Sequence, residues 1–143
     1  MTRAEIYKEI REMMGVVPMQ FKSLPDSMLE TEWELFKKSE AEEGAIPAKY
    51  RELMGLAVAS AIHCKYCAFF HTEVARLAGA TDAEIEEATR VAKFTSGWSA
   101  YANGMQFDFN QFKGEVLTAC DHMKKQMAKK TGKKTRELVG AAR

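Results

Sequence analysis

Apolar residues recur at helical spacing along almost the whole chain. Near the start, Thr2 and Glu5 are spaced as a capping box. Ile6 and Ile10 follow on one helical face, and Gly15 marks the end of this first helix. No segment alternates between polar and apolar residues over the length of a strand. The pattern therefore predicts an all-α protein.

The same reasoning predicts further helices and the loops between them. Their approximate ranges are 26–44, 48–62, 64–77, 81–94 and 111–130. A loop with two prolines is expected over residues 16–25, followed by Asp26 as the N-cap of the next helix. Residues 53–62 are almost entirely apolar, which predicts a place at the centre of the core. The stripe of the fifth helix continues beyond an expected kink at Ser96-Gly97.

Length, composition and charge narrow the class of protein. The chain of 143 residues suits one domain, which we place at residues 1–130. Eight Lys and Arg in residues 121–143 predict a solvated helix end and a basic tail over residues 131–143. The net charge of +1 does not point to nucleic acid or a membrane as a partner. The N-terminus lacks the apolar core of a signal peptide, so we expect a cytoplasmic protein.

The richest chemical pattern lies in residues 63–71. Cys64, Cys67 and His71 stand at positions i, i+3 and i+7, which share one face of a helix. Cys64 falls in the first turn, where the positive end of the helix dipole favours a thiolate. His71 lies one turn beyond Cys67 and is placed to accept its proton. These spacings indicate a thiol/disulfide active site.

Two other interpretations of the cysteines stay open at this point. Cys64 and Cys67 would also suit a packed helix as small buried hydrophobes. A zinc site would need His63 and His71 as well, but one helix cannot easily wrap four ligands around a metal, and His63 would point away. Haem attachment is excluded, because Ala68 rather than histidine follows the second cysteine. No βαβ pattern surrounds the motif, so a redox role requires an all-helical scaffold.

The motif resembles that of a known family with such a scaffold. Eleven residues separate Glu52 from Cys64. Tyr66 precedes Cys67, and His71 follows Cys67 by four residues. This order resembles the signature of alkylhydroperoxidase D-like proteins, which belong to the carboxymuconolactone decarboxylase superfamily.

The resemblance extends over roughly residues 25–110, with similar flanking sequences at 46–53 and 77–85. It implies an alkylhydroperoxidase D-like helical bundle with the CxxC at the N-terminus of a central helix. It also implies a homo-oligomer, a trimer or a hexamer. We expect no cofactor and no metal.

The resemblance further implies a catalytic set of Glu52, Cys64, Tyr66, Cys67 and His71. In the cycle that it implies, Cys67 loses its proton through His71 and Glu52 and attacks a hydroperoxide, becoming a sulfenic acid. Cys64 then closes the Cys64–Cys67 redox disulfide, and an external dithiol or protein reductant reduces it.

Geometry supports Glu52 independently of the family. If residues 62–63 form the turn of a helical hairpin, Glu52 lies opposite about residue 73, within a turn of His71. Glu52 also begins the most apolar helix, where a carboxylate requires a partner. Electrostatics alone would favour Cys64 as the thiolate; we assign the attack to Cys67 because His71 is near it and the family suggests it.

Two further functions remain as alternatives. One is a decarboxylase-like lyase that uses His71 and Glu52 as acid and base, and the other is a non-enzymatic redox-sensing protein. Cys120 has no neighbouring motif and is expected to be a buried structural thiol. A second apolar cluster suggests intrachain core, a surface between subunits or the wall of a pocket beside Cys67. It comprises Phe94, Trp98, Tyr101, Met105, Phe107, Phe109 and Phe112.

Overall fold

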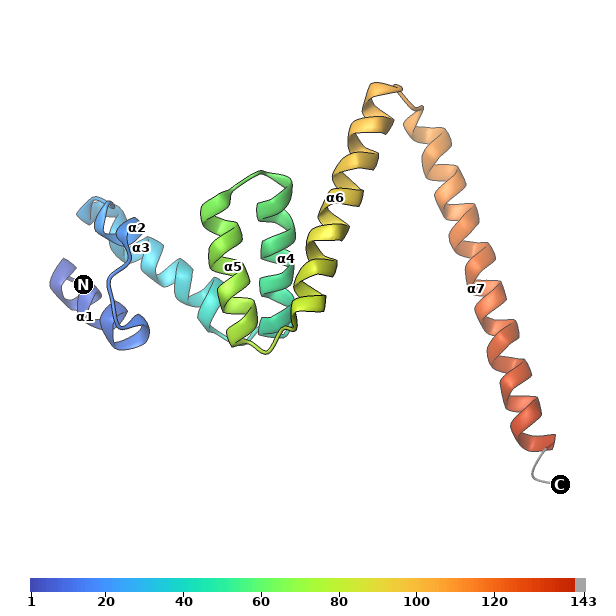
Figure 1. The fold of residues 1–143 in the computed structure, drawn as a ribbon, viewed down its shortest axis with the longest axis horizontal. Coiled ribbons are helices and arrows are strands. Elements are labelled where there is room, and N and C mark those ends of the chain that lie inside the picture. Colours follow the sequence, from blue (N-terminus) through green and yellow to red (C-terminus); the bar gives the residue numbers. More distant parts are fainter. Residues whose placement is uncertain (141–143) are drawn as a thin grey trace. The chain divides into compact units, whose positions relative to one another are not determined.

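Helices make up nearly all of the described chain (Figure 1). The computed structural model describes the backbone of residues 1–140 and the side chains of residues 1–129. Its elements are α1 (Arg3–Met14), α2 (Met19–Lys22), α3 (Asp26–Phe36), a π-helical turn η1 (Lys37–Ala41), α4 (Ala48–Ala61), α5 (Lys65–Leu77), α6 (Asp82–Gly104) and α7 (Phe109–Gly140). No strand occurs within residues 1–140, so the all-α prediction is confirmed.

Internal contacts divide the chain into two compact units, Met1–Lys93 and Phe94–Arg143. The single domain expected over residues 1–130 stays a prediction, and the basic tail at 131–143 lies outside the residues whose side chains are described. Within the described part of the chain, no helix has the length and apolar character needed to cross a membrane.

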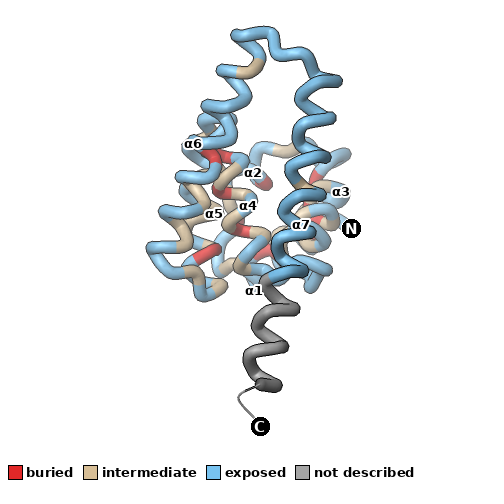
Figure 2. Tube along the Cα trace, turned by 90° about the vertical axis from the view of Figure 1, so that its right-hand side faces the viewer, coloured by how far each residue is buried: buried red, intermediate tan, exposed pale blue. Residues whose placement is uncertain are grey.

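The core of the first unit is built where α1, α2 and α3 meet, as the buried positions in Figure 2 show. Its buried members are Ile6, Ile10, Val17, Phe21, Leu29 and Trp33. The Trp33 ring stacks on Phe36 with centroids 5.7 Å apart and meets Phe21 edge-to-face at 5.5 Å. The buried indole nitrogen of Trp33 donates a hydrogen bond of 2.9 Å to Glu9. Aromatic packing therefore fixes α3 against the N-terminal helices.

The ends of α1 follow the sequence prediction. Thr2 and Glu5 form a capping box in which each side chain accepts from the other's backbone N–H. Gly15 ends the helix with a left-handed φ of 74°, a conformation that glycine adopts without strain.

Three expectations for the next segment were wrong. The loop at 16–25 contains the four-residue helix α2, which buries Phe21. The N-cap of α3 is Pro25 rather than Asp26, whose carboxylate, one position inside the helix, pairs with the guanidinium of Arg3. The α-helix ends at Phe36 instead of near residue 44, because the chain continues as the π-helical turn η1.

Helices α4 and α5 form an antiparallel hairpin (Figure 1). The turn predicted at residues 62–63 is confirmed, and His63 adopts a left-handed φ of 57° within it. The helices approach over small buried residues, Ala59 on α4 and Ala75 on α5. The expectation that residues 53–62 are buried on every side was wrong. Three large apolar side chains of that stretch are more than half exposed: Met54, Val58 and Ile62.

Thr81 and Glu84 form a second capping box at the start of α6. Glu84 also accepts a hydrogen bond of 2.7 Å from Lys49 on α4. These partners, Lys49 first and then the Thr81 N–H, lower the pKa of Glu84 to about 2. The kink expected at Ser96-Gly97 was wrong, since α6 is one continuous helix.

In the second unit, α7 begins at Phe109 rather than near Gln111. The Asp108 carboxylate accepts a hydrogen bond from the Gln111 N–H at 2.7 Å, which is the geometry of an N-cap. Almost all described side chains of this unit are exposed (Figure 2).

The buried face of α1 provides a test of the first core. Ile10 is fully buried, whereas Met13 on the same helix is half exposed. We expect Ile10→Ala to lower the free energy of unfolding by about 2–5 kcal/mol in urea denaturation. The control Met13→Ala should change it by less than about 1 kcal/mol. Equal effects of the two substitutions would contradict the core assignment.

Candidate active site

Cys64 caps the N-terminus of α5. Its backbone is extended, with φ −88° and ψ 98°, and its sulfur accepts a hydrogen bond of 3.3 Å from the Cys67 N–H. The sulfur therefore occupies the N-cap position, at the positive end of the helix dipole.

The two motif sulfurs lie side by side as free thiols, with Sγ atoms 2.8 Å apart. The hydrogen bond from the Cys67 thiol lowers the pKa of Cys64, aided by the backbone N–H groups of Cys67 and Tyr66. The same bond raises the pKa of Cys67, and burial and the Cys64 charge act in the same direction. Of the two thiols, Cys64 therefore loses its proton more readily than Cys67.

One turn further along α5, His71 meets Glu52 of α4. The Nδ1 of His71 lies 2.8 Å from Oε2 of Glu52. The Glu52 side chain is only 1% exposed, and that of His71 is 19% exposed. An ionised carboxylate only accepts hydrogen bonds, so it holds the proton of a neutral His71 on Nδ1 and leaves Nε2 free as a base.

Gly55 makes this approach possible, and the sequence analysis missed it. A Cβ atom added to Gly55 would lie 2.5–2.7 Å from three atoms of the His71 ring. The sequence did contain a signal for this role, a glycine inside an apolar helix. Glycine there lowers the stability of the helix by roughly 1 kcal/mol relative to alanine, so its presence indicates a packing or functional role.

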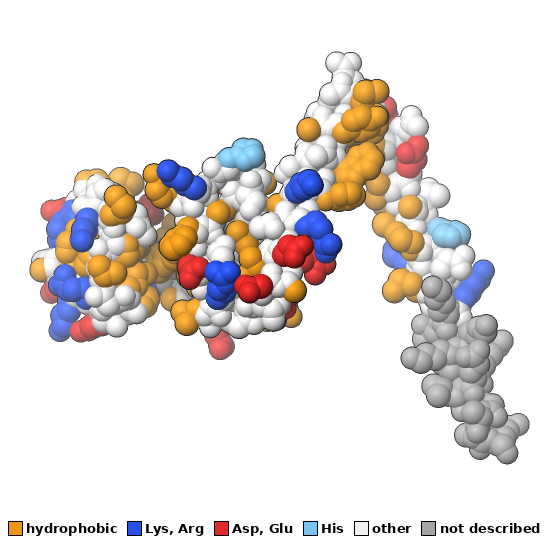
Figure 3. All heavy atoms as spheres, viewed as in Figure 1, with side chains coloured by type: hydrophobic (Ala, Val, Ile, Leu, Met, Phe, Trp, Pro, Cys, Tyr) orange, Lys and Arg blue, Asp and Glu red, His pale blue; other side chains and the backbone are white. Residues whose placement is uncertain are grey.

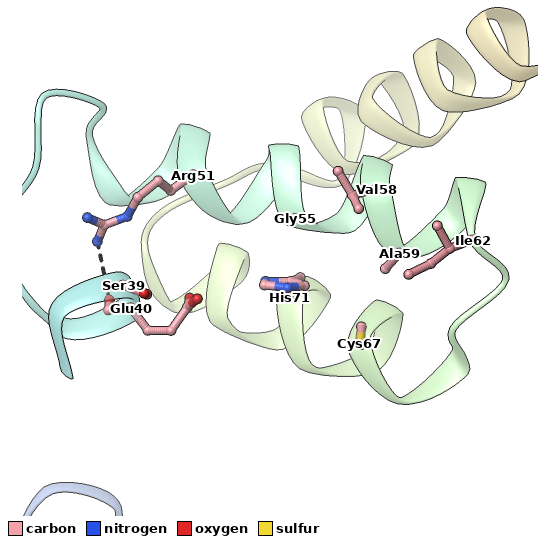
Figure 4. Close-up of a pocket in the computed structure, with 9 residues that line it drawn as sticks. All are labelled: Ser39, Glu40, Arg51, Gly55, Val58, Ala59, Ile62, Cys67 and His71. Atoms are coloured by element: carbon pink, nitrogen blue, oxygen red, sulfur yellow. Dashed lines mark hydrogen bonds between the residues drawn. The ribbon is translucent and has the colours of Figure 1, made fainter. Parts of the chain in front are cut away.

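A pocket of about 370 Å³ lies beside the hairpin (Figure 4). Its lining comprises Ser39, Glu40, Arg51, Gly55, Val58, Ala59, Ile62, Cys67 and His71. The second cysteine and the histidine thus face a common space, whereas Cys64 is not part of its wall. The wall next to Cys67 is apolar and the opposite end is charged, so the pocket has two chemically different ends.

The charged end contains Glu40, which sequence reasoning did not select. Three atoms that could bind a metal lie within 4.8 Å of one another: one carboxylate oxygen each of Glu40 and Glu52, and one ring nitrogen of His71. Glu40 belongs to η1, and no local pattern connects it with α4 or α5. The cysteines and histidines weighed above as zinc ligands form no such cluster among the described residues.

Tyr66 is the predicted site residue with the most exposed side chain. Tyr66 is 74% exposed, and the Lys65 ammonium lies 5.2 Å from the centre of its ring. Tyr66 is not among the lining residues, and its catalytic role stays a prediction. Cys120 belongs to α7 in the other unit and is partly buried.

The chain is similar to known proteins in both sequence and fold. The model of the carboxymuconolactone decarboxylase family matches residues 25–107. Among solved structures, the chain is similar to the alkylhydroperoxidase AhpD core from Rhodospirillum rubrum, at 30% sequence identity and a TM-score of 0.66. This match covers 73% of the present chain and 80% of that one. No curated protein sequence matches the chain. The family resemblance is confirmed: the chain belongs to the carboxymuconolactone decarboxylase family and is an alkylhydroperoxidase D-like protein.

Proposed function

We propose that the protein is a thiol-dependent peroxidase that cycles between a dithiol and a disulfide. The observation that carries the proposal is the adjacency of two pairs. Cys64 and Cys67 have sulfurs 2.8 Å apart, and Cys67 shares a pocket with His71, which is bound to Glu52. The cysteine pair supplies two electrons, and the pair of His71 and Glu52 accepts and returns a proton.

The reaction balances with an external dithiol as the electron donor. His71 accepts the Cys67 proton, and the thiolate attacks the outer oxygen of a hydroperoxide. The O–O bond breaks, an S–O bond forms, and the alcohol leaves with a proton from His71. Cys64 then attacks the sulfenic sulfur, so that an S–S bond forms and water leaves. Thiol–disulfide exchange with the dithiol restores both thiols. A cytoplasmic setting, where thiols are kept reduced, would suit this donor.

The two cysteines receive different roles for different reasons. Cys67 lines the pocket, so a bound peroxide would meet its sulfur first. Its pKa is raised by the bond to Cys64, by burial and by the Cys64 charge, and it therefore needs a base, which His71 can provide. Cys64 has the lowered pKa and is ready as the second nucleophile.

Two alternatives use the same residues differently. A decarboxylase-like lyase would need His71 and Glu52 but no redox change at sulfur. A redox sensor would oxidise the cysteines without turnover. Hydroperoxide consumption that continues with dithiol supply is expected for the peroxidase alone.

Stopped-flow mixing of the reduced protein with hydrogen peroxide and cumene hydroperoxide tests the proposal. We expect loss of two thiols per chain and multiple turnovers when dithiothreitol is present. In Cys64→Ser, a sulfenic acid should persist on Cys67, where dimedone traps it for mass spectrometry. Cys67→Ser should show only background consumption, and the control Cys120→Ser should match wild type.

Other outcomes would be equally informative. Retention of all thiols in wild type would exclude the peroxidase. A dimedone adduct on Cys64 in Cys67→Ser would assign the attack to Cys64.

The position of the His71 ring can be tested through Gly55. We expect Gly55→Ala to displace the ring and to slow alkylation of Cys67 about 10- to 100-fold at pH 7. The matched control is Gly97→Ala on α6, where an added Cβ meets no atom within 4 Å. A wild-type rate in Gly55→Ala, with the helix content retained, would show that the ring position does not matter.

We also propose that the protein is a homo-oligomer. Phe94, Trp98, Tyr101 and Phe107 form a chain of edge-to-face rings, with successive centroids 5.8–6.2 Å apart. Each of these side chains is about half exposed or more, and Figure 3 shows the hydrophobic cluster on the surface of this unit. An aromatic surface of this kind is suited to burial against another protein surface.

Light scattering tests the oligomer. We expect a mass of three or six chains at micromolar concentration, and Trp98→Glu should lower it. The control Lys113→Glu changes an exposed side chain of the same unit and should leave the mass unchanged. A monomer in wild type would contradict the proposal.

A further inference from the structure

The buried carboxylate at the active site has only one of its two oxygens paired. Oε2 of Glu52 is bound to His71, but Oε1 is buried and accepts no hydrogen bond from any described group. A buried acceptor without a donor costs roughly 1–3 kcal/mol, and more when it is charged. This oxygen therefore calls for a donor.

Glu40 is the group best placed to supply one. Its side chain extends from η1 toward His71, as Figure 4 shows. One carboxylate oxygen each of Glu40 and Glu52 and one ring nitrogen of His71 lie within 4.8 Å of one another. Among the described residues, the guanidinium of Arg51 forms no ion pair with the Glu40 carboxylate. It donates to the backbone carbonyls of Glu40, at 3.2 Å, and of Glu42, at 2.8 Å, and its Nε is buried without a partner.

We propose that Glu40 is a positioning residue: its carboxyl group retains a proton and donates it to Oε1 of Glu52. The inference rests on the proposed function, because the bond would hold Glu52 so that Glu52 can orient His71 toward Cys67. In this role Glu40 acts through Glu52 and His71 rather than on the reacting atoms.

The electrostatic surroundings favour the protonated form. The groups facing Glu40 are Arg51 and Glu52 on α4 and His71 on α5. Burial is the largest influence and raises the pKa of Glu40, and the Glu52 charge raises it further against smaller opposing effects of His71 and Arg51. Two neighbouring carboxylates do not both ionise readily, because their charges repel each other. A proton shared between Glu40 and Glu52 removes this repulsion and also gives Oε1 of Glu52 a hydrogen bond.

A divalent cation held by Glu40, Glu52 and His71 is the competing occupant. Two carboxylates and an imidazole are acceptable ligands for such an ion. However, Nδ1 of His71 is already engaged by Glu52 at 2.8 Å, and a metal bound there would remove the proton from that bond. The paired arrangement in the structure therefore favours the proton.

The test compares Glu40→Gln, Glu40→Ala and the control Glu43→Gln. Glutamine keeps a permanent donor, alanine removes it, and Glu43 is an exposed neighbour whose substitution makes the same charge change. Alkylation of Cys67 by iodoacetamide, followed by peptide mass spectrometry from pH 5 to 9, serves as the readout. Circular dichroism confirms folding of each variant.

We expect Glu40→Ala to slow alkylation about tenfold and Glu40→Gln to restore most of the loss, with Glu43→Gln like wild type. Glu40 carries its proton below its raised pKa and loses it above. The ratio of the wild-type rate to the Glu40→Gln rate should therefore fall as pH rises through that pKa. The ¹³C resonance of the Glu40 carboxyl should titrate in the same range, above that of exposed glutamates.

Three results would overturn the inference. They are equal rates in wild type and Glu40→Ala, titration of Glu40 in the ordinary carboxyl range, and stoichiometric binding of Zn²⁺ or Mn²⁺ that Glu40→Gln abolishes. None of these measurements needs peroxide. A protein that consumes no hydroperoxide but keeps the alanine–glutamine difference would refute the proposed function and leave this inference intact.

Discussion

The site depends on the burial of one carboxylate between two helices. Glu52 is removed from water almost completely and is held by a single bond to His71. A charged group in such a place is stable only if its partners replace the lost hydration. The close approach of α4 and α5 provides this, and it requires the absence of a side chain at Gly55. The packing of the hairpin and the orientation of His71 therefore both depend on Gly55.

The cysteine pair adds a second proton-sharing unit on the same helix. Cys64 takes its stabilisation from the start of α5 and from the Cys67 thiol, so its lowered pKa is a property of the helix end. The same bond raises the pKa of Cys67, so Cys67 can act as a nucleophile only if a base lies nearby to remove its proton. His71 shares a pocket with Cys67, and Nε2 is its free nitrogen while Glu52 holds Nδ1. The proposed division of labour between the cysteines follows from this asymmetry.

Much of the fold could be predicted because its signals are local. Capping boxes lie within four residues, and the CxxC and His71 are related by the repeat of one helix. Glu52 was within reach because a hairpin turn relates its position to that of His71 by simple counting. The helix α2 was missed because four residues are too few to display a repeat. Gly55 and Glu40 were missed because their roles consist of contacts with other elements, which no periodicity encodes.

The π-helical turn η1 explains why the role of Glu40 could not be predicted from the sequence. An α-helix that gains one residue in a turn rotates everything beyond it by about 100°. In η1 this happens just after Phe36, whose ring is anchored by Trp33 and Phe21, so the rotation acts on the residues that follow. Glu40 lies within this turn and reaches the pocket that α4 and α5 form. A regular helix through residue 44 would have directed position 40 differently, so the departure from regular geometry is itself part of how the site is assembled.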